Sequence, residues 1–226
     1  MPADITSRGP VGVLGGMFDP VHSGHLQAAK AACEFCHLDH VLLIPCGIPV
    51  HRERADASAA QRCDMLRLAI GATDWLALDT RECRGEGPNR TFDTLKALRS
   101  EYPGQALCLI IGLDQFLNFH TWYRWRDILD LTHLAVITRP GYTLADGIGN
   151  PELRDECARR MTRAGNELAR RDAGLICLVE AATAPWSSTM IRDAVRQGRE
   201  TAEMLPAGVR DYIHKHGLYH TNGAHP

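Results

Sequence analysis

The segment Gly15-Gly16-Met17-Phe18-Asp19-Pro20-Val21-His22-Ser23-Gly24-His25 decides the fold prediction. It follows the apolar run 11–14, typical of a buried strand, and leads into a stretch with helical apolar spacing, about 23–37. Two adjacent glycines end the strand, so backbone N–H groups can approach a phosphate with no Cβ in the way. Strand, glycine turn and helix start together predict an α/β phosphate-binding unit.

Two histidines, His22 and His25, stand three residues apart at the start of the predicted helix. A helix N-terminus carries free amides and partial positive charge, so both imidazoles can face one anion. Either histidine alone is more often a solvated or core residue, but the joint pattern is specific. A dehydrogenase is excluded because the chain lacks G-x-G-x-x-G here and has no acidic residue after its second strand.

Short apolar runs alternate with amphipathic stretches along the chain. Buried strands with little polar alternation, as in a parallel sheet covered by helices, are also predicted at 41–44, 107–111, 134–137 and 175–179. Helices are predicted after the capping box Ser58-x-x-Gln61, after Thr91, and between Pro206 and Gly217. The pattern predicts an α/β fold: a Rossmann-like, doubly wound, mainly parallel sheet with helices on both faces, in a single domain over 1–226.

Composition narrows the class of protein. The 226 residues carry a net charge of -2 and are 45% hydrophobic and 23% charged, which is typical of a globular protein and argues against a general nucleic-acid binder. The polar start MPADITSRGP has no apolar core of a signal peptide, and no apolar run is long enough for a membrane span. Eight scattered cysteines do not form a disulfide framework, so we expect a cytoplasmic protein without membrane partners.

The motif G-G-x-F-D-P-x-H-x-G-H resembles the signature of the nucleotidylyltransferase superfamily, and specifically that of the bacterial nicotinate-nucleotide adenylyltransferases. The resemblance extends from Val13 to Tyr219. It implies adenylyl transfer from ATP to nicotinate mononucleotide in NAD biosynthesis, giving deamido-NAD and pyrophosphate, with His22, His25 and Arg192 as catalytic residues. Nicotinamide mononucleotide and, less favoured, phosphopantetheine remain alternative acceptors. Mg²⁺ is expected to arrive with ATP, held by phosphates and water, with no protein metal site.

A second phosphate segment follows the last predicted strand, at Ser187-Ser188-Thr189-Met190-Ile191-Arg192. Hydroxyls at a helix start cap free N–H groups, and an arginine on the first turn can clasp phosphate oxygens. Taken alone, the segment is more often an ordinary N-cap with a surface arginine. It resembles the family motif that binds the ATP β- and γ-phosphates, so the helical part about 185–220 is expected to complete the ATP site. The resemblance assigns these residues to ATP: Gly15, Gly16, Met17, Phe18, His22, Gly24, His25, Ser187, Ser188, Thr189, Ile191 and Arg192.

The residues that would bind the acceptor nucleotide are assigned mainly from the resemblance to the family. Gly112 and Asp114 follow a buried strand, at the edge where open α/β sheets bind ligands. Trp122 resembles the family tryptophan that stacks on the pyridine ring. Arg90 would favour the acid over the amide nucleotide if it faced the carboxylate, and pointing to solvent is equally expected. The full set assigned to nicotinate mononucleotide is Asp19, His51, Arg52, Asn89, Arg90, Thr91, Gly112, Asp114, Trp122 and Arg139.

Two departures from the family pattern and several rival readings accompany this assignment. Met17 stands where relatives usually carry Ser or Thr, and Trp186 where they carry an aliphatic residue. The C-x-x-C-H pattern at 33–37 matches haem attachment but lacks an export signal, and a zinc site there lacks a second ligand pair. A non-enzymatic nucleotide-binding regulator is the rival of another class. The sequence assigns no role to the charged helix expected at 153–171 and no oligomeric state.

Overall fold

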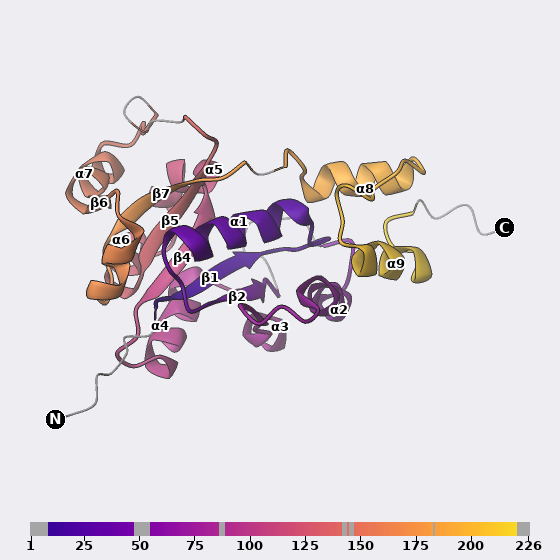
Figure 1. The fold of residues 1–226 in the computed structure, drawn as a ribbon, viewed down its shortest axis with the longest axis horizontal. Helices are drawn as coiled ribbons and strands as arrows, with labels where there is room; N and C mark the ends of the chain where they lie inside the picture. Colours follow the sequence, from indigo (N-terminus) through magenta and orange to yellow (C-terminus); the bar gives the residue numbers. More distant parts are fainter. Residues whose placement is uncertain are drawn as a thin grey trace. The chain divides into compact units, whose positions relative to one another are not determined.

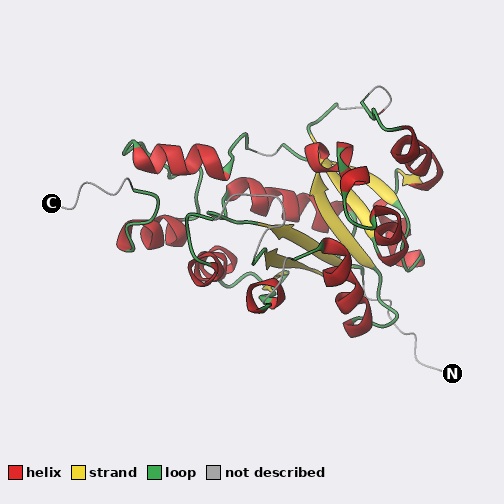
Figure 2. Cartoon of the chain, turned by 180° about the vertical axis from the view of Figure 1, so that it is seen from behind, coloured by secondary structure: helices red, strands yellow, loops and turns green. Residues whose placement is uncertain are grey.

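The computed structural model describes residues 9–47, 55–85, 89–141, 144, 147–182 and 184–220. A seven-stranded sheet runs through it in the order β3-β2-β1-β4-β5-β7-β6. The pairings of β4 with β1 and β5, and of β7 with β5 and β6, are parallel. Helices lie beside the strands of the sheet and connect them along the chain (Figure 2). The predicted α/β, Rossmann-like class with a mainly parallel sheet is confirmed.

The elements have the following bounds. The strands are β1 (Val11–Gly16), β2 (His40–Pro45), β3 (Leu76–Leu78), β4 (Leu107–Gly112), β5 (His133–Thr138), β6 (Met161–Thr162) and β7 (Ile176–Glu180). The helices are α1 (Ser23–Phe35), α2 (Ala59–Ile70), α3 (Arg81–Arg84), α4 (Thr91–Glu101), α5 (Leu113–Leu117), α6 (Trp125–Leu131), α7 (Pro151–Arg160), α8 (Ser188–Arg196) and α9 (Ala207–Lys215), with 3-10 turns η1 (Phe119–Thr121) and η3 (Gly165–Arg170).

The central strands are buried on both faces, which explains their unbroken apolar sequences. Every residue of β5 is buried, and so are the first five of β4. In register, Leu109 lies opposite Leu134, and Leu134 lies opposite Ile176. Because helices cover such strands, polar residues are confined to their ends. The strand ends are therefore where polar side chains can reach the surface of the sheet.

The chain forms two compact units. The first consists of Met1–Leu14, Ala29–Leu42 and Arg90–Ala182, and the second of Gly15–Ala28, Leu43–Asn89 and Thr183–Pro226. In the second unit α2 packs against α9, and the Tyr212 hydroxyl donates to the Asp64 carboxylate at 3.1 Å (Figure 1). The carboxyl end of β1 and both predicted phosphate segments belong to this second unit. The single domain over 1–226 stays a prediction.

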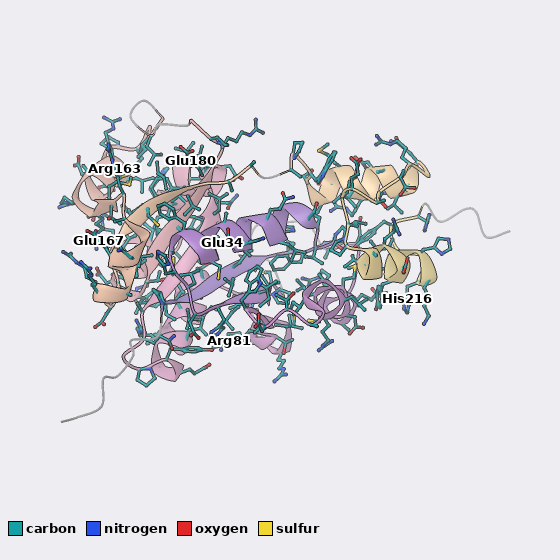
Figure 3. All side chains as sticks on the ribbon, viewed as in Figure 1. Glu34, Arg81, Arg163, Glu167, Glu180 and His216 are labelled. Atoms are coloured by element: carbon teal, nitrogen blue, oxygen red, sulfur yellow. The ribbon has the colours of Figure 1, made fainter. Side chains whose placement is uncertain are left out.

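One helix prediction is wrong. The charged stretch 153–171 is not one helix, because α7 ends at Arg160 and the next two residues form β6. There Met161 and Thr162 pair with β7, and the Thr162 hydroxyl donates to Glu167 at 2.5 Å. Figure 3 labels Arg163 and Glu167 on the segment beyond α7. Charge patterning suggested one continuous helix, but pairing with a neighbouring strand interrupted it.

The other expected helix ends are largely confirmed. Ser58 and Gln61 form the predicted capping box of α2, and α4 and α9 occupy the predicted ranges. The short strands β3 and β6 were not predicted, since two or three residues carry no readable period. Of the helices in the described ranges, none has both the length and the apolar character required to cross a bilayer.

Candidate active site

Two imidazoles meet at the start of α1. The rings of His22 and His25 are 3.7 Å apart between centroids. The backbone N–H of His22 donates to Nδ1 of His25 at 3.3 Å. In a neutral imidazole one nitrogen accepts and the other carries the proton, so this bond places the His25 proton on Nε2. His25 therefore offers an N–H donor to a bound anion.

The loop around the imidazoles is closely packed. The Phe18 ring is 1% exposed and meets His25 edge-on at 4.9 Å. A Cβ on Gly24 would lie 3.1 Å from Cε1 and Nδ1 of His22, so the glycine of H-x-G-H leaves room for that ring. A Cβ on Gly15 would meet nothing within 4 Å. A side chain at Gly24, between the two histidines, would therefore be crowded by His22, whereas Gly15, at the end of the strand, has open space beside its backbone.

Both imidazoles are neutral at pH 7 in this structure. Burial lowers the pKa of His22 from 6.5 to about 4. Burial, and then the neighbouring His22, hold the pKa of His25 well below its ordinary value. Nδ1 of His22 is buried without a partner among the described residues. As neutral imidazoles, the two side chains can each offer one N–H donor, and bound phosphate anions would raise both pKa values.

Acidification is expected to destabilise the ligand-free protein through His22. Its folded-state pKa of about 4 lies below the unfolded value of 6.5, so the unfolded chain binds more protons between these values. Above pH 6.5 the neutral His22 does not reduce the free energy of unfolding. As the pH falls from 6.5 toward 4, the unfolded chain takes up the proton more readily and the free energy of unfolding decreases. Between pH 7.5 and 4.5 the loss should be about 2 to 3 kcal/mol. Urea unfolding of wild type and His22→Gln at both pH values measures it, and parallel losses in the two proteins would contradict it.

The second phosphate segment is attached to the same loop. Ser187 caps α8 by accepting from the Met190 N–H at 3.2 Å. The Ser188 hydroxyl donates to the Pro20 carbonyl at 3.0 Å, and Nη1 of Arg192 donates to the Asp19 carbonyl at 2.9 Å. Within the second unit, the helix start with the arginine and the loop with the histidines therefore lie together.

The remaining residues of this segment support the helix. Ile191 is fully buried and anchors α8. Nη2 of Arg192 lies 3.5 Å from the Thr189 hydroxyl. The ATP contacts assigned to Thr189 and Ile191 stay predictions.

Asp56 is a partner of Arg192 that the sequence reasoning missed. Its carboxylate lies 3.0 Å from Nε of Arg192 and 2.8 Å from Nη2 of Arg196. Asp56 follows the predicted acceptor residues His51 and Arg52, which lie outside the described residues. No spacing in the sequence marks Asp56, because its two partners are more than 130 positions away.

Asp19 has a structural role that the sequence did not indicate. Its carboxylate is 4% exposed and accepts the N–H groups of Asp56 at 2.8 Å and Ala57 at 3.1 Å. It also accepts the Tyr219 hydroxyl at 2.8 Å. Burial, and then the adjacent Asp19, raise the pKa of Tyr219, so this hydroxyl stays a donor. Asp19 thus links the first loop, the start of α2 and the C-terminal segment, and its contact with nicotinate mononucleotide stays a prediction.

Several predicted acceptor residues lie in the first unit, at the ends of β4 and β5. Gly112 pairs in register with Ile137, two residues before the exposed Arg139. A Cβ on Gly112 would lie 2.7 Å from Oδ1 of Asp114, so the glycine allows the carboxylate to fold back over the strand end. Adjacent parallel strands end at one sheet edge, so Gly112 and Arg139 share that edge.

Two of the residues predicted to bind nicotinate mononucleotide, Trp122 and Arg90, contact other aromatic side chains of the protein. Trp122 is half-buried and packs against Phe119 at 5.2 Å between ring centroids. The Arg90 guanidinium lies 4.2 Å above the Tyr123 ring, in a cation–π contact. Both expectations held for Arg90, a contact with the nicotinate carboxylate and a solvent-facing side chain, stay predictions. Thr91 is the first residue of α4.

The Asn89 side chain lies in the second unit, where its Oδ1 accepts from the Gly47 N–H at 3.0 Å. This bond joins Asn89 to the segment that follows β2, within the second unit. In the described part of the chain, no group of three or more His, Cys, Asp or Glu side chains is arranged to hold a metal ion.

The fold is that of a nucleotidyltransferase, and the model of the family described as Cytidylyltransferase-like matches residues 13–194, a range that includes both predicted phosphate segments. The chain is 39% identical to a probable nicotinate-nucleotide adenylyltransferase of Marinomonas sp. (strain MWYL1), covering 92% of this chain and 93% of that one. It is 41% identical to the protein of the same name from Klebsiella pneumoniae (strain 342), covering 92% and 95%. The chain belongs to the nicotinate-nucleotide adenylyltransferase family.

A solved structure shows the same fold at low sequence identity. It is Plasmodium falciparum nicotinic acid mononucleotide adenylyltransferase complexed with NaAD. The TM-score is 0.69 at 13% identity, with 94% of this chain and 98% of that chain covered. The architecture is therefore retained where little sequence is shared.

Proposed function

We propose that this protein transfers the adenylyl group of ATP to nicotinate mononucleotide, giving deamido-NAD and pyrophosphate in NAD biosynthesis. One observation carries the ATP half of the proposal. The imidazole pair and Arg192 are held by one loop, because Arg192 donates to the Asp19 carbonyl at 2.9 Å, three residues before His22. The acceptor is supported by the names of relatives that match the chain over nearly its full length.

The chemistry needs positioning more than a strong base. An oxygen of the acceptor phosphate attacks the α-phosphorus of ATP in line, forming one P–O bond while the bond to the leaving pyrophosphate breaks. Nucleophile and leaving group are both ionised already, so no covalent enzyme intermediate is required. His25, through its Nε2–H, and His22 would stabilise the transferring phosphate, and Arg192 the departing pyrophosphate.

The arginine is pre-positioned for this role. A guanidinium has five N–H donors. Nη1 donates to the Asp19 carbonyl and Nη2 to the Thr189 hydroxyl, which leaves one N–H on each Nη for phosphate oxygens. Nε lies 3.0 Å from the Asp56 carboxylate but has no hydrogen-bond partner among the described residues. Because the side chain is already fixed, little reorganisation accompanies the reaction.

Two further parts of the proposal concern the metal and the compartment. We propose that Mg²⁺ enters with ATP and is held mainly by phosphates and water, as is usual for this ion. We also propose a reducing, cytoplasmic location, supported by all eight cysteines being free thiols.

The deciding experiment measures pyrophosphate release from MgATP with three acceptors side by side: nicotinate mononucleotide, nicotinamide mononucleotide and phosphopantetheine. We expect kcat/KM for the acid to exceed that for the amide at least about tenfold, since an unmet charged contact costs about 1.5 to 3 kcal/mol. Phosphopantetheine should give background rates. ATP binding with no pyrophosphate release in the presence of any acceptor would contradict the proposal and favour a nucleotide-binding regulator, and release that does not depend on an acceptor would contradict it as simple ATP hydrolysis.

A further inference from the structure

Arg62 is a charged residue on the buried face of α2. It is 1% exposed, and residues three and four positions later, Met65 and Leu66, belong to the same core. Its Nη1 donates to the Met17 carbonyl at 2.8 Å. Its Nε is buried, with no hydrogen-bond partner in the described ranges. An arginine in this position serves a purpose other than packing.

The charge of Arg62 has no counterion among the described residues. In the parts of the chain that the structure describes, no carboxylate lies within 4.0 Å of its guanidinium, whereas Arg67 on the same helix pairs with Asp64 at 2.6 Å. The nearby thiols do not replace a carboxylate, because burial and the adjacent Cys63 raise the pKa of Cys83 to about 12. Arginine stays protonated, and an unpaired buried charge destabilises a fold. The described residues of the ligand-free protein therefore leave this cation uncompensated.

This cation lies directly against the glycine loop. The Met17–Phe18 peptide is planar and trans, so its carbonyl and its N–H point to opposite sides. Because Arg62 binds the carbonyl, the Phe18 N–H is turned away from Arg62. No described residue accepts a hydrogen bond from that N–H. Phe18 also has a positive φ of 50°, a conformation in which successive N–H groups gather around an anion.

We propose that Arg62 is a positioning residue of the ATP site, and that the anion which compensates its charge is the bound polyphosphate. It orients the Phe18 N–H toward the phosphates and adds its own positive potential from behind the loop. This inference rests on the proposed function, because it takes the glycine loop as the phosphate site. It predicts that Arg62 favours ligand binding at the expense of ligand-free stability.

The test compares Arg62→Met, which removes the charge at similar length, with Arg62→Lys, which keeps it. Arg67→Met, on the same helix with a 59% exposed side chain, is the matched control. Binding of ATP and of inorganic tripolyphosphate is measured by calorimetry without acceptor, and Tm without ligand. For Arg62→Met we expect a Tm no more than about 2 °C below wild type. Its Kd for both ligands should rise at least about tenfold.

The remaining outcomes separate positioning from structural support. Arg62→Lys should bind ATP at least about threefold more tightly than Arg62→Met, and Arg67→Met should match wild type. An unchanged Kd for Arg62→Met overturns the proposal. So does an unfolded variant or a Tm more than about 5 °C lower, because Arg62 would then be needed for the fold itself.

Binding and turnover also separate this inference from the proposed function. If wild type binds ATP but releases no pyrophosphate with any acceptor, the proposed function fails while the Arg62 comparison still holds. If turnover is as proposed and Arg62→Met binds ATP like wild type, only the Arg62 inference fails.

Discussion

Replacing His25 by alanine is expected to lower turnover by a factor of about 100 to 1,000 and to leave the fold intact. One pre-positioned donor at a developing charge typically stabilises the transition state by about 2.7 to 4 kcal/mol. The structure specifies which atom is lost: the Nε2–H, since Nδ1 accepts from the His22 backbone at 3.3 Å. Steady-state rates of pyrophosphate release with MgATP and nicotinate mononucleotide measure the effect.

Two amide substitutions distinguish the nitrogens of His25. Asparagine can accept the His22 N–H near the position of Nδ1 but has no donor at Nε2, so His25→Asn should be as slow as His25→Ala. Glutamine reaches the Nε2 position and should recover at least about tenfold over alanine. His216→Ala, at the exposed end of α9 and labelled in Figure 3, is the control and should match wild type. A loss below threefold in His25→Ala would remove His25 from the site.

Replacing Arg192 by alanine is the second large effect, with an expected loss of about 100-fold or more in kcat/KM for ATP. The guanidinium is the charged donor for the departing pyrophosphate, and it is fixed by Asp19 and Asp56 before ATP binds. Arg192→Lys should recover less than about tenfold, because an ammonium cannot contact the Asp19 carbonyl and clasp phosphate oxygens as a planar fork does.

Arg196 provides the matched comparison for Arg192. It lies one turn further along α8 and shares the same Asp56 carboxylate at 2.8 Å, but its hydrogen bonds run to Asp193 and Asp56 and not to the first loop. Arg196→Ala should therefore change kcat/KM less than about fivefold. Equal losses in Arg192→Ala and Arg196→Ala would show that α8 acts through its overall charge and not through one positioned guanidinium.

The features that could be predicted depend on residues close together in the sequence, whereas those that were missed depend on residues far apart in it. The H-x-G-H loop, the α8 cap at Ser187 and the strands β1, β2, β4, β5 and β7 are local patterns, and each was readable from neighbouring residues. The helix expected at 153–171 failed because pairing of Met161 with Ile176 in β7 interrupted it. Arg62 did carry a signal, a charged residue in register with Met65 and Leu66, which the sequence reasoning passed over.

By itself, the sequence determined the fold class and the two helix starts, because hydrophobic period, capping residues and glycine turns act over a few residues. The family followed from the resemblance of the motifs. Only the tertiary structure decided which side chains hold one another across long separations. These are Asp19 with Tyr219 and the start of α2, Asp56 between two arginines, and Arg62 under the Met17 carbonyl. Such contacts depend on burial and on hydrogen-bond partners brought together by folding, and neither is encoded in local spacing.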